Sequence, residues 1–298
     1  MRNFALYAIT VLIWGTTWFA IEFQLGVVPA EVSIVWRYAL AASLMFLWCG
    51  WRGLPLRYGW RDHLVFAGFG ALLFGFNYIG AYLAQHYIPS ALNAVCFTSV
   101  VWLNILNARL FLRTPIETTV VAGAGLGVVG IICLFWPSLR TLSLGEGTLI
   151  GALLALAGSL AASLGNVLAQ RAQTRGLRVE PANAWGMLYG TLIVAAIAAL
   201  QGKPFIFDWS QPYILSLLYL AVFGSVIGFW CYLTLIGEIG AHRAGFVVVL
   251  FPVVAVLISV AFEGLAVDRY LLGGVTLVLF GNTVTLWHAF RRRTRATA

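Results

Sequence analysis

The sequence has few charged residues. Its 298 residues include 18 lysines and arginines and 10 aspartates and glutamates, or 9% of the chain, whereas a soluble globular protein has about 25%. Hydrophobic residues make up 61% of the chain, and the mean hydropathy is +0.92. These values exclude a soluble fold. Because the basic residues collect near the ends of apolar segments, we expect the chain to lie in a lipid bilayer and to bind no nucleic acid.

The sequence also lacks the spacings of metal sites, disulfides and common hydrolases. The four cysteines stand singly within apolar segments and form no CxxC pair. The four histidines fall near segment ends, without an HExxH or GxSxG motif. We therefore expect no metal, no cofactor and no catalytic residue. An intramembrane enzyme is the remoter alternative.

Long apolar stretches fill most of the chain. A helix needs about 20 apolar residues to cross the hydrocarbon core, and helices satisfy their own backbone in lipid. Prolines and glycines mark most of the gaps between stretches. The pattern predicts an all-α polytopic membrane protein with ten transmembrane helices, at approximately 4–22, 31–50, 62–84, 91–111, 118–136, 148–171, 182–201, 212–235, 242–262 and 269–290.

Charge alternates between the two sets of connections. One set, with both chain ends, carries fourteen basic and four acidic residues, a net charge of +10. The other set carries three basic and six acidic residues, a net charge of −3. Since positive loops stay in the cytoplasm, both termini are predicted to be cytoplasmic.

The chain contains a weak internal repeat. At a shift of 151 residues, Gly123 falls on Gly274 and Gly130 on Gly281, and residues 88 to 130 need no gap. We expect two domains, 1–147 and 148–298. Each has five predicted spans, an odd number, so the second half must insert upside down. Such inverted repeats place a substrate site near the bilayer midplane and work by alternating access.

Several motifs resemble the EamA module of the drug/metabolite transporter superfamily. They are Leu12-Ile13-Trp14-Gly15, Trp36-Arg37-Tyr38, Arg52-Gly53, Ile239-Gly240-Ala241, Leu250-Phe251-Pro252 and Glu263 with Gly274 and Gly281. The first half departs from the module, with Val101 in place of a proline and Leu112-Arg113 in place of a glutamate. The resemblance implies ten helices in two inverted five-helix repeats around a central cavity. The aromatic side chains resemble those of bacterial amino-acid exporters of the YddG type.

Polar and aromatic residues inside the spans are candidates for the lining of a substrate path, since such side chains should face the protein interior. Amides and hydroxyls can bind both ends of a zwitterion, and aromatic rings can hold an apolar group or a cation. Interfacial anchoring of the aromatics and helix packing by the serines are the alternatives. The candidate substrate-binding residues are Trp14, Trp18, Asn77, Tyr78, Tyr82, Ser99, Trp102, Ser163, Asn166 and Tyr232.

Two further residues are candidates for gating or structural roles. Arg37 is a charge inside the second span. It is either functional, or it snorkels to the interface or pairs with a carbonyl at a helix end. Pro252 lies inside the ninth span, where a kink is either a hinge or a static bend.

The predicted function is export of small amphiphilic metabolites, most simply amino acids, across a bacterial inner membrane by a monomer. Acidic residues lie only near the span ends or in loops. Because carboxylates within the membrane are the usual means of proton coupling, we expect no coupling ion. The alternatives are a carrier of another metabolite class and a proton-coupled drug exporter.

Overall fold

The fold is helical throughout the part of the chain that the structure describes. The computed structural model describes residues 2–24, 26–88, 90–140, 145–262 and 267–296, and no strand forms among them. This confirms the predicted all-α class. Six helical stretches are long and apolar enough to cross a bilayer: Ala30–Trp51, Trp60–Ala84, Val95–Leu112, Glu146–Thr174, Val179–Leu200 and Gln211–Ile239. The arrangement as ten spans in two inverted repeats stays a prediction.

The first half of the chain begins with two long helices and continues with shorter segments. Its elements are α1 (Arg2–Glu22), α2 (Ala30–Trp51), α3 (Trp60–Gly70), η1 (Ala71–Phe76), α4 (Asn77–Gln85), α5 (Ser90–Phe97), α6 (Ser99–Leu112), α7 (Thr118–Leu134) and α8 (Trp136–Leu139). Glycine or a left-handed residue ends some of these helices: Gly53 has φ +61° after α2, and Arg113 has φ +55° after α6.

The second half contains another run of long helices. Its elements are α9 (Glu146–Thr174), α10 (Val179–Leu200), α11 (Gln211–Tyr219), η2 (Leu220–Ile227), α12 (Gly228–Ile239), α13 (Ala241–Ala244), α14 (Val247–Phe262) and α15 (Arg269–Ala296). Pro252 lies inside α14, which continues past it. The break in this region falls instead between α13 and α14.

Two π-helical segments interrupt the third and eighth predicted spans. The segment η1 joins α3 to α4 and η2 joins α11 to α12, in each case without a loop. A π turn inserts one residue and alters the hydrogen-bond ladder, which leaves carbonyl groups open to other donors. In both segments a side chain uses such a carbonyl: Asn77 Nδ2 donates to Leu73 O at 3.2 Å, and Trp14 Nε1 donates to Gly224 O at 3.1 Å.

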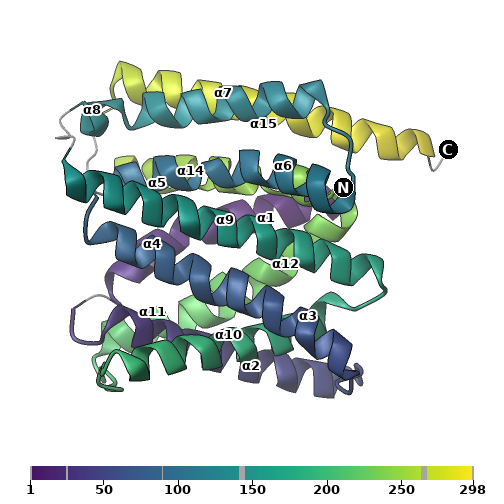
Figure 1. Cartoon of the computed structure of the whole chain (residues 1–298). Coiled ribbons are helices and arrows are strands. Elements are labelled where there is room, and N and C mark those ends of the chain that lie inside the picture. The colour runs from purple at the N-terminus through teal and green to yellow at the C-terminus, as the bar shows by residue number, and fades with distance from the viewer. Residues whose placement is uncertain (1, 25, 89, 141–144, 263–266, 297–298) are drawn as a thin grey trace.

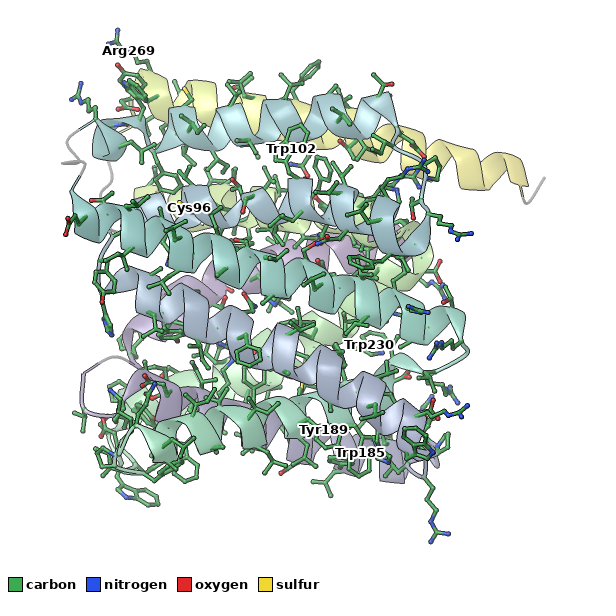
Figure 2. All side chains as sticks on the ribbon, viewed as in Figure 1. Cys96, Trp102, Trp185, Tyr189, Trp230 and Arg269 are labelled. Atoms are coloured by element: carbon green, nitrogen blue, oxygen red, sulfur yellow. The ribbon has the colours of Figure 1, made fainter. Side chains whose placement is uncertain are left out.

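The helices lie side by side in one bundle (Figure 1). The pair α7 and α15 forms one edge of the bundle, and α2 and α10 lie at the opposite edge. The start of α1 and the end of α15 lie at the same end of the bundle, and Arg269 lies at the other end (Figures 1 and 2).

Glycines allow α7 and α15 to approach closely. A Cβ atom on Gly123 would lie 2.6 Å from Gly281 O, and one on Gly281 would lie 2.7 Å from Gly123 O. The same reciprocal contact joins Gly130 and Gly274, at 2.9 and 2.7 Å. The two contacts have the same geometry. Because the 151-residue shift places Gly123 on Gly274 and Gly130 on Gly281, it converts one contact into the other.

Candidate functional site

A cavity of about 140 Å³ lies in the middle of the bundle, and residues of α1, α2, η1, α4, α5, α6, α9, α12 and α14 line it. Its wall is mainly aromatic and aliphatic, with one arginine and three asparagines. The lining residues are Trp14, Thr17, Ile21, Arg37, Leu73, Asn77, Tyr78, Ala81, Tyr82, Asn93, Phe97, Val100, Ala162, Asn166, Phe229, Tyr232, Val248 and Phe251.

Trp14 anchors an aromatic wall between α1 and α12. Its ring packs against Phe229 and Tyr232, with centroid separations of 5.0 and 4.9 Å. The hydrogen bond from Trp14 Nε1 to Gly224 O fixes the indole, so that its ring and not its N–H is available to a bound molecule. This wall suits an apolar or aromatic group.

Arg37 supplies the positive charge of the cavity. The residue is 5% exposed, and its Nε donates to Ser225 Oγ at 2.9 Å. Its guanidinium carbon lies 5.3 Å from the Tyr38 ring centroid and 5.5 Å from that of Tyr78. The ion pairs formed among the described side chains are Arg2–Glu238 and Arg243–Glu117, so none of them neutralises Arg37. A guanidinium group can pair with a carboxylate or another anionic group.

Gly224 makes room for the arginine. A Cβ atom at this position would lie 3.1 Å from Arg37 Nη2 and 3.0 Å from Thr17 Cγ2. A side chain on η2 at this point would therefore crowd the guanidinium.

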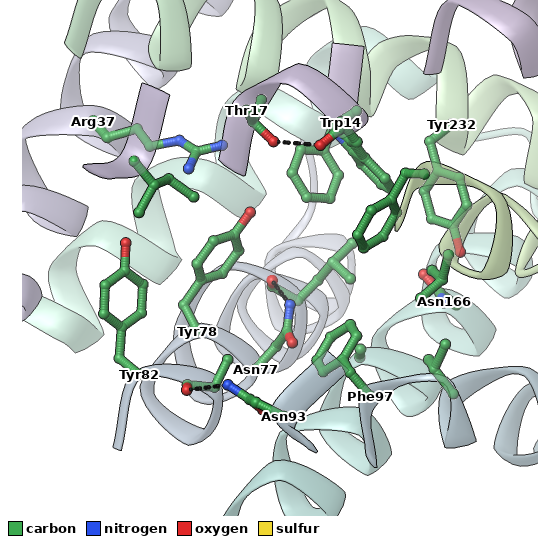
Figure 3. Close-up of a pocket in the computed structure, with 18 residues that line it drawn as sticks. Trp14, Thr17, Arg37, Asn77, Tyr78, Tyr82, Asn93, Phe97, Asn166 and Tyr232 are labelled. Carbon is green, nitrogen blue, oxygen red and sulfur yellow. Dashed lines mark hydrogen bonds between the residues drawn. The ribbon is translucent and has the colours of Figure 1, made fainter. Parts of the chain in front are cut away.

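Two tyrosines project from α4 towards Arg37. In Figure 3 the hydroxyl ends of Tyr78 and Tyr82 point to the side of the cavity where Arg37 lies. Asn77, Asn93 and Asn166 lie across the cavity from it. The cavity thus has a cationic side and an amide side, joined by aromatic surfaces.

Seven of the residues predicted from the sequence line this one cavity. They are Trp14, Arg37, Asn77, Tyr78, Tyr82, Asn166 and Tyr232. The side chain of Trp18 lies outside the described part of the structure. Pro252 is buried but is not part of the wall, although its neighbour Phe251 is.

Three predicted residues lie elsewhere. Trp102 is 39% exposed on α6 and does not line the cavity (Figure 2). Ser99 is also outside the lining. Ser163 is fully buried and accepts a hydrogen bond from Asn107 Nδ2 at 2.9 Å, so it joins α6 to α9, as expected for the alternative of helix packing.

The sequence prediction missed Asn93 and most of the apolar wall. Asn93, Phe97 and Val100 have i, i+4, i+7 spacing, and the same stripe continues to Asn104, which accepts from Asn166 Nδ2 at 3.3 Å. This continuity was the available signal for choosing that face over the face of Trp102. Phe229 and Phe251 carry no polarity that would distinguish a cavity wall from packed core.

Two ion pairs connect the halves at the end of the bundle where α1 begins. Arg243 before α14 pairs with Glu117 before α7, and Arg2 on α1 pairs with Glu238 on α12. The first pair is mostly shielded, with side chains 16% and 18% exposed, whereas the Arg2 side chain is 72% exposed. The Arg243–Glu117 contact is therefore the stronger candidate for holding this end closed.

The described residues contain no group of three or more His, Cys, Asp or Glu side chains able to hold a metal ion.

The sequence matches a family of transporters along nearly its whole length. The model of the EamA-like transporter family matches residues 3–136 and again residues 149–287.

Bacterial relatives align over most of the chain. The chain is 30% identical over 265 residues to the Uncharacterized inner membrane transporter YedA of Escherichia coli, covering 88% of this chain and 81% of that protein. It is 26% identical over 286 residues to the Uncharacterized transporter YvbV of Bacillus subtilis, covering 93% and 89%. It is 23% identical over 283 residues to Protein PagO of Salmonella typhimurium, covering 94% and 91%.

A solved structure shares the fold. A protein crystal structure superimposes with a TM-score of 0.82 at 20% sequence identity, covering 97% of this chain and 98% of that one.

Proposed function

Because the chain belongs to the EamA-like transporter family, we propose that it is a membrane transporter for small amphiphilic metabolites, chiefly amino acids with apolar or aromatic side chains. It exports them across a bacterial inner membrane. The central cavity is the substrate site, and Arg37 binds the substrate carboxylate.

The observation that carries this proposal is the isolated buried charge of Arg37 in an aromatic cavity. Burying a cation is costly unless a partner compensates it. Among the described residues Arg37 has hydroxyl groups and aromatic rings as neighbours but forms no ion pair with a carboxylate, so a bound molecule can supply that carboxylate. An amino-acid carboxylate would complete the site, and its side chain would rest on the wall formed by Trp14 and Phe229.

Residues 1–147 and 148–298 form two inverted repeats in this proposal, which rock about the cavity. The two ranges matched by the family model support this division. So do the exchangeable glycine contacts between α7 and α15 and the presence of one π-helical segment in each half. Since both halves belong to one chain, a monomer is sufficient for transport.

The membrane orientation in this proposal follows from the charges of the connections. The end of the bundle with both termini carries the net charge of +10 counted above, so it faces the cytoplasm. The ion pair Arg243–Glu117 then lies on the cytoplasmic side.

The substrate gradient drives transport in this proposal. The support is the cavity wall, whose described lining contains no aspartate or glutamate that could relay a proton. In proteoliposomes, an imposed proton gradient should leave the final internal level of labelled amino acid equal to the external level. Accumulation above that level that disappears with a protonophore would contradict uncoupled transport.

Counterflow tests the substrate assignment. Proteoliposomes are preloaded with one unlabelled amino acid at a time and offered labelled phenylalanine or leucine. We expect saturable uptake that Tyr82→Ala abolishes, because Tyr82 lines the cavity beside Arg37. No exchange with any amino acid, from protein shown to be folded, would overturn the substrate class.

A further inference from the structure

Two asparagines on the side of the cavity away from Arg37 are held in a fixed orientation. Asn77 is 8% exposed and Asn93 is 2% exposed, and both line the cavity. Asn77 Nδ2 donates to Leu73 O at 3.2 Å, and Asn93 Nδ2 donates to Ala81 O at 2.9 Å. A backbone carbonyl only accepts hydrogen bonds, so the amide nitrogen and not the oxygen must face it.

This orientation leaves both amide oxygens without a protein donor. Asn77 Oδ1 and Asn93 Oδ1 are buried and have no hydrogen-bond partner among the described residues. An unpartnered buried acceptor is unfavourable and calls for a ligand, a water molecule or an ion.

The two amides come from neighbouring helices, Asn77 from α4 and Asn93 from α5, but both are held by carbonyl groups of the η1–α4 segment. Leu73, Asn77 and Ala81 are spaced four residues apart, so the carbonyl groups that hold the amides lie on one side of η1 and α4. All three residues line the cavity. Figure 3 shows both bonds as dashed lines, on the side of the cavity away from Arg37.

We infer that Asn77 and Asn93 form the recognition site for the primary ammonium group of the substrate. The inference rests on the proposed function and adds a specificity rule to it: a free amine is required. An ammonium group has three donors and no acceptor, which matches two amide oxygens whose own nitrogens are turned to backbone carbonyls. A second carboxylate would face two lone-pair-bearing oxygens and would be rejected.

The surroundings favour a cation over a neutral donor. The Phe97 ring belongs to the same cavity wall, one turn after Asn93 on α5, and aromatic faces attract a desolvated cation. The amides are neutral, so they can accept an ammonium group without a carboxylate in the wall. The substrate would therefore lie with its negative end towards Arg37 and its positive end towards Asn77 and Asn93.

A competition series with matched ligands tests the inference. Counterflow of labelled phenylalanine is measured in proteoliposomes against unlabelled phenylalanine, 3-phenylpropionate, which lacks the amine, and phenethylamine, which lacks the carboxylate. In the wild-type protein we expect phenylalanine to compete at least tenfold better than 3-phenylpropionate, the minimum loss for one charge-assisted hydrogen bond.

Substitutions then assign the effect to the amides. Asn93→Leu should weaken competition by phenylalanine and phenethylamine at least tenfold and leave competition by 3-phenylpropionate unchanged. Asn77→Leu is the second variant. The matched control is Asn183→Leu, because Asn183 is fully buried in α10 with both amide atoms unpartnered but lies outside the cavity. Asn183→Leu should leave the ratio of the affinities for phenylalanine and 3-phenylpropionate unchanged.

The outcomes separate this inference from the proposed function. Exchange in which 3-phenylpropionate competes as well as phenylalanine in the wild-type protein would overturn the amine site and leave a carboxylate carrier standing. Exchange that requires Na⁺ and does not depend on the amine of the ligand would assign Asn77 Oδ1 and Asn93 Oδ1 to a metal ion. That result would also overturn the inference. Folded protein without any exchange would overturn the proposed function and this inference with it. The wild-type comparison decides even where a variant does not fold.

Discussion

Arg37 is the residue on which the account of the cavity depends. Its side chain crosses from α2 to η2, where Ser225 Oγ accepts a hydrogen bond from its Nε. Gly224 leaves room there for its guanidinium group. Ser225 Oγ in turn donates to Leu220 O at 3.0 Å within the π-helical segment. The position of the arginine is therefore set by the irregular backbone of η2, and a regular helix would present different groups to it.

Replacing this arginine should remove carboxylate binding. For Arg37→Met we expect the half-saturating concentration of phenylalanine in counterflow to rise roughly 10- to 100-fold, because a hydrogen bond to a charged group contributes about 1.5–3 kcal/mol. Competition by phenethylamine should change little. Arg52→Met is the control, since Arg52 is exposed beyond the end of α2. If competition by phenethylamine weakens as much as the exchange of phenylalanine, Arg37 has a merely structural role.

At the scale of elements, the π-helical segments were beyond sequence prediction. Turn-forming prolines and glycines placed the helices well, because these residues act on the local backbone. A π segment arises from a single extra residue within an otherwise ordinary apolar helix, and the sequences of η1 and η2 differ little from their flanks. The tertiary contacts of η2, which include Trp14 and Arg37, are also not visible in the local sequence.

The choice of helix face explains why Ser99 and Trp102 lie outside the cavity wall. Around residues 93–107 the sequence offers two polar faces. The face of Ser99 and Trp102 has an aromatic residue at mid-depth, whereas the face of Asn93 and Asn104 contacts the cavity and α9. Aromatic character alone does not distinguish a cavity wall from a lipid contact, since both environments accept it.

The contact between α7 and α15 should fail when a methyl group is added. A Cβ atom at Gly123 would collide with Gly281 O and with the Thr285 hydroxyl. We expect Gly123→Ala to lower the free energy of unfolding by about 1–3 kcal/mol, the usual cost of overpacking, measured by thermal unfolding in detergent. The control is Gly125→Ala, two residues away, where the added atom meets nothing within 4 Å. It should be neutral or stabilising. Equal melting temperatures for the two variants would contradict the close packing.

At the scale of the whole molecule, the ion pairs between the halves should control access to the cavity. Glu117→Gln removes the carboxylate that pairs with Arg243. The end of the bundle with both termini should then open more often. The expected result is a several-fold faster reaction of an Ala162→Cys thiol in the cavity wall with an impermeant maleimide added from that side, in a background without the native cysteines.

The exposed pair provides the comparison for this experiment. Glu238→Gln breaks the contact with Arg2, whose side chain is 72% exposed, so the effect on labelling should be small. If both substitutions leave the labelling rate unchanged, the Arg243–Glu117 pair does not hold that end closed.

The most direct test of the central claim, that the cavity binds the transported molecule, compares two substitutions that differ in position. Asn166→Ala alters the cavity wall, whereas Trp102→Ala alters an exposed side chain on α6. Counterflow of labelled phenylalanine is measured for both variants, reconstituted at equal amounts. The account predicts that Asn166→Ala loses most of the exchange and that Trp102→Ala retains it. Full exchange by Asn166→Ala together with loss in Trp102→Ala would place the substrate path outside the cavity and contradict the account.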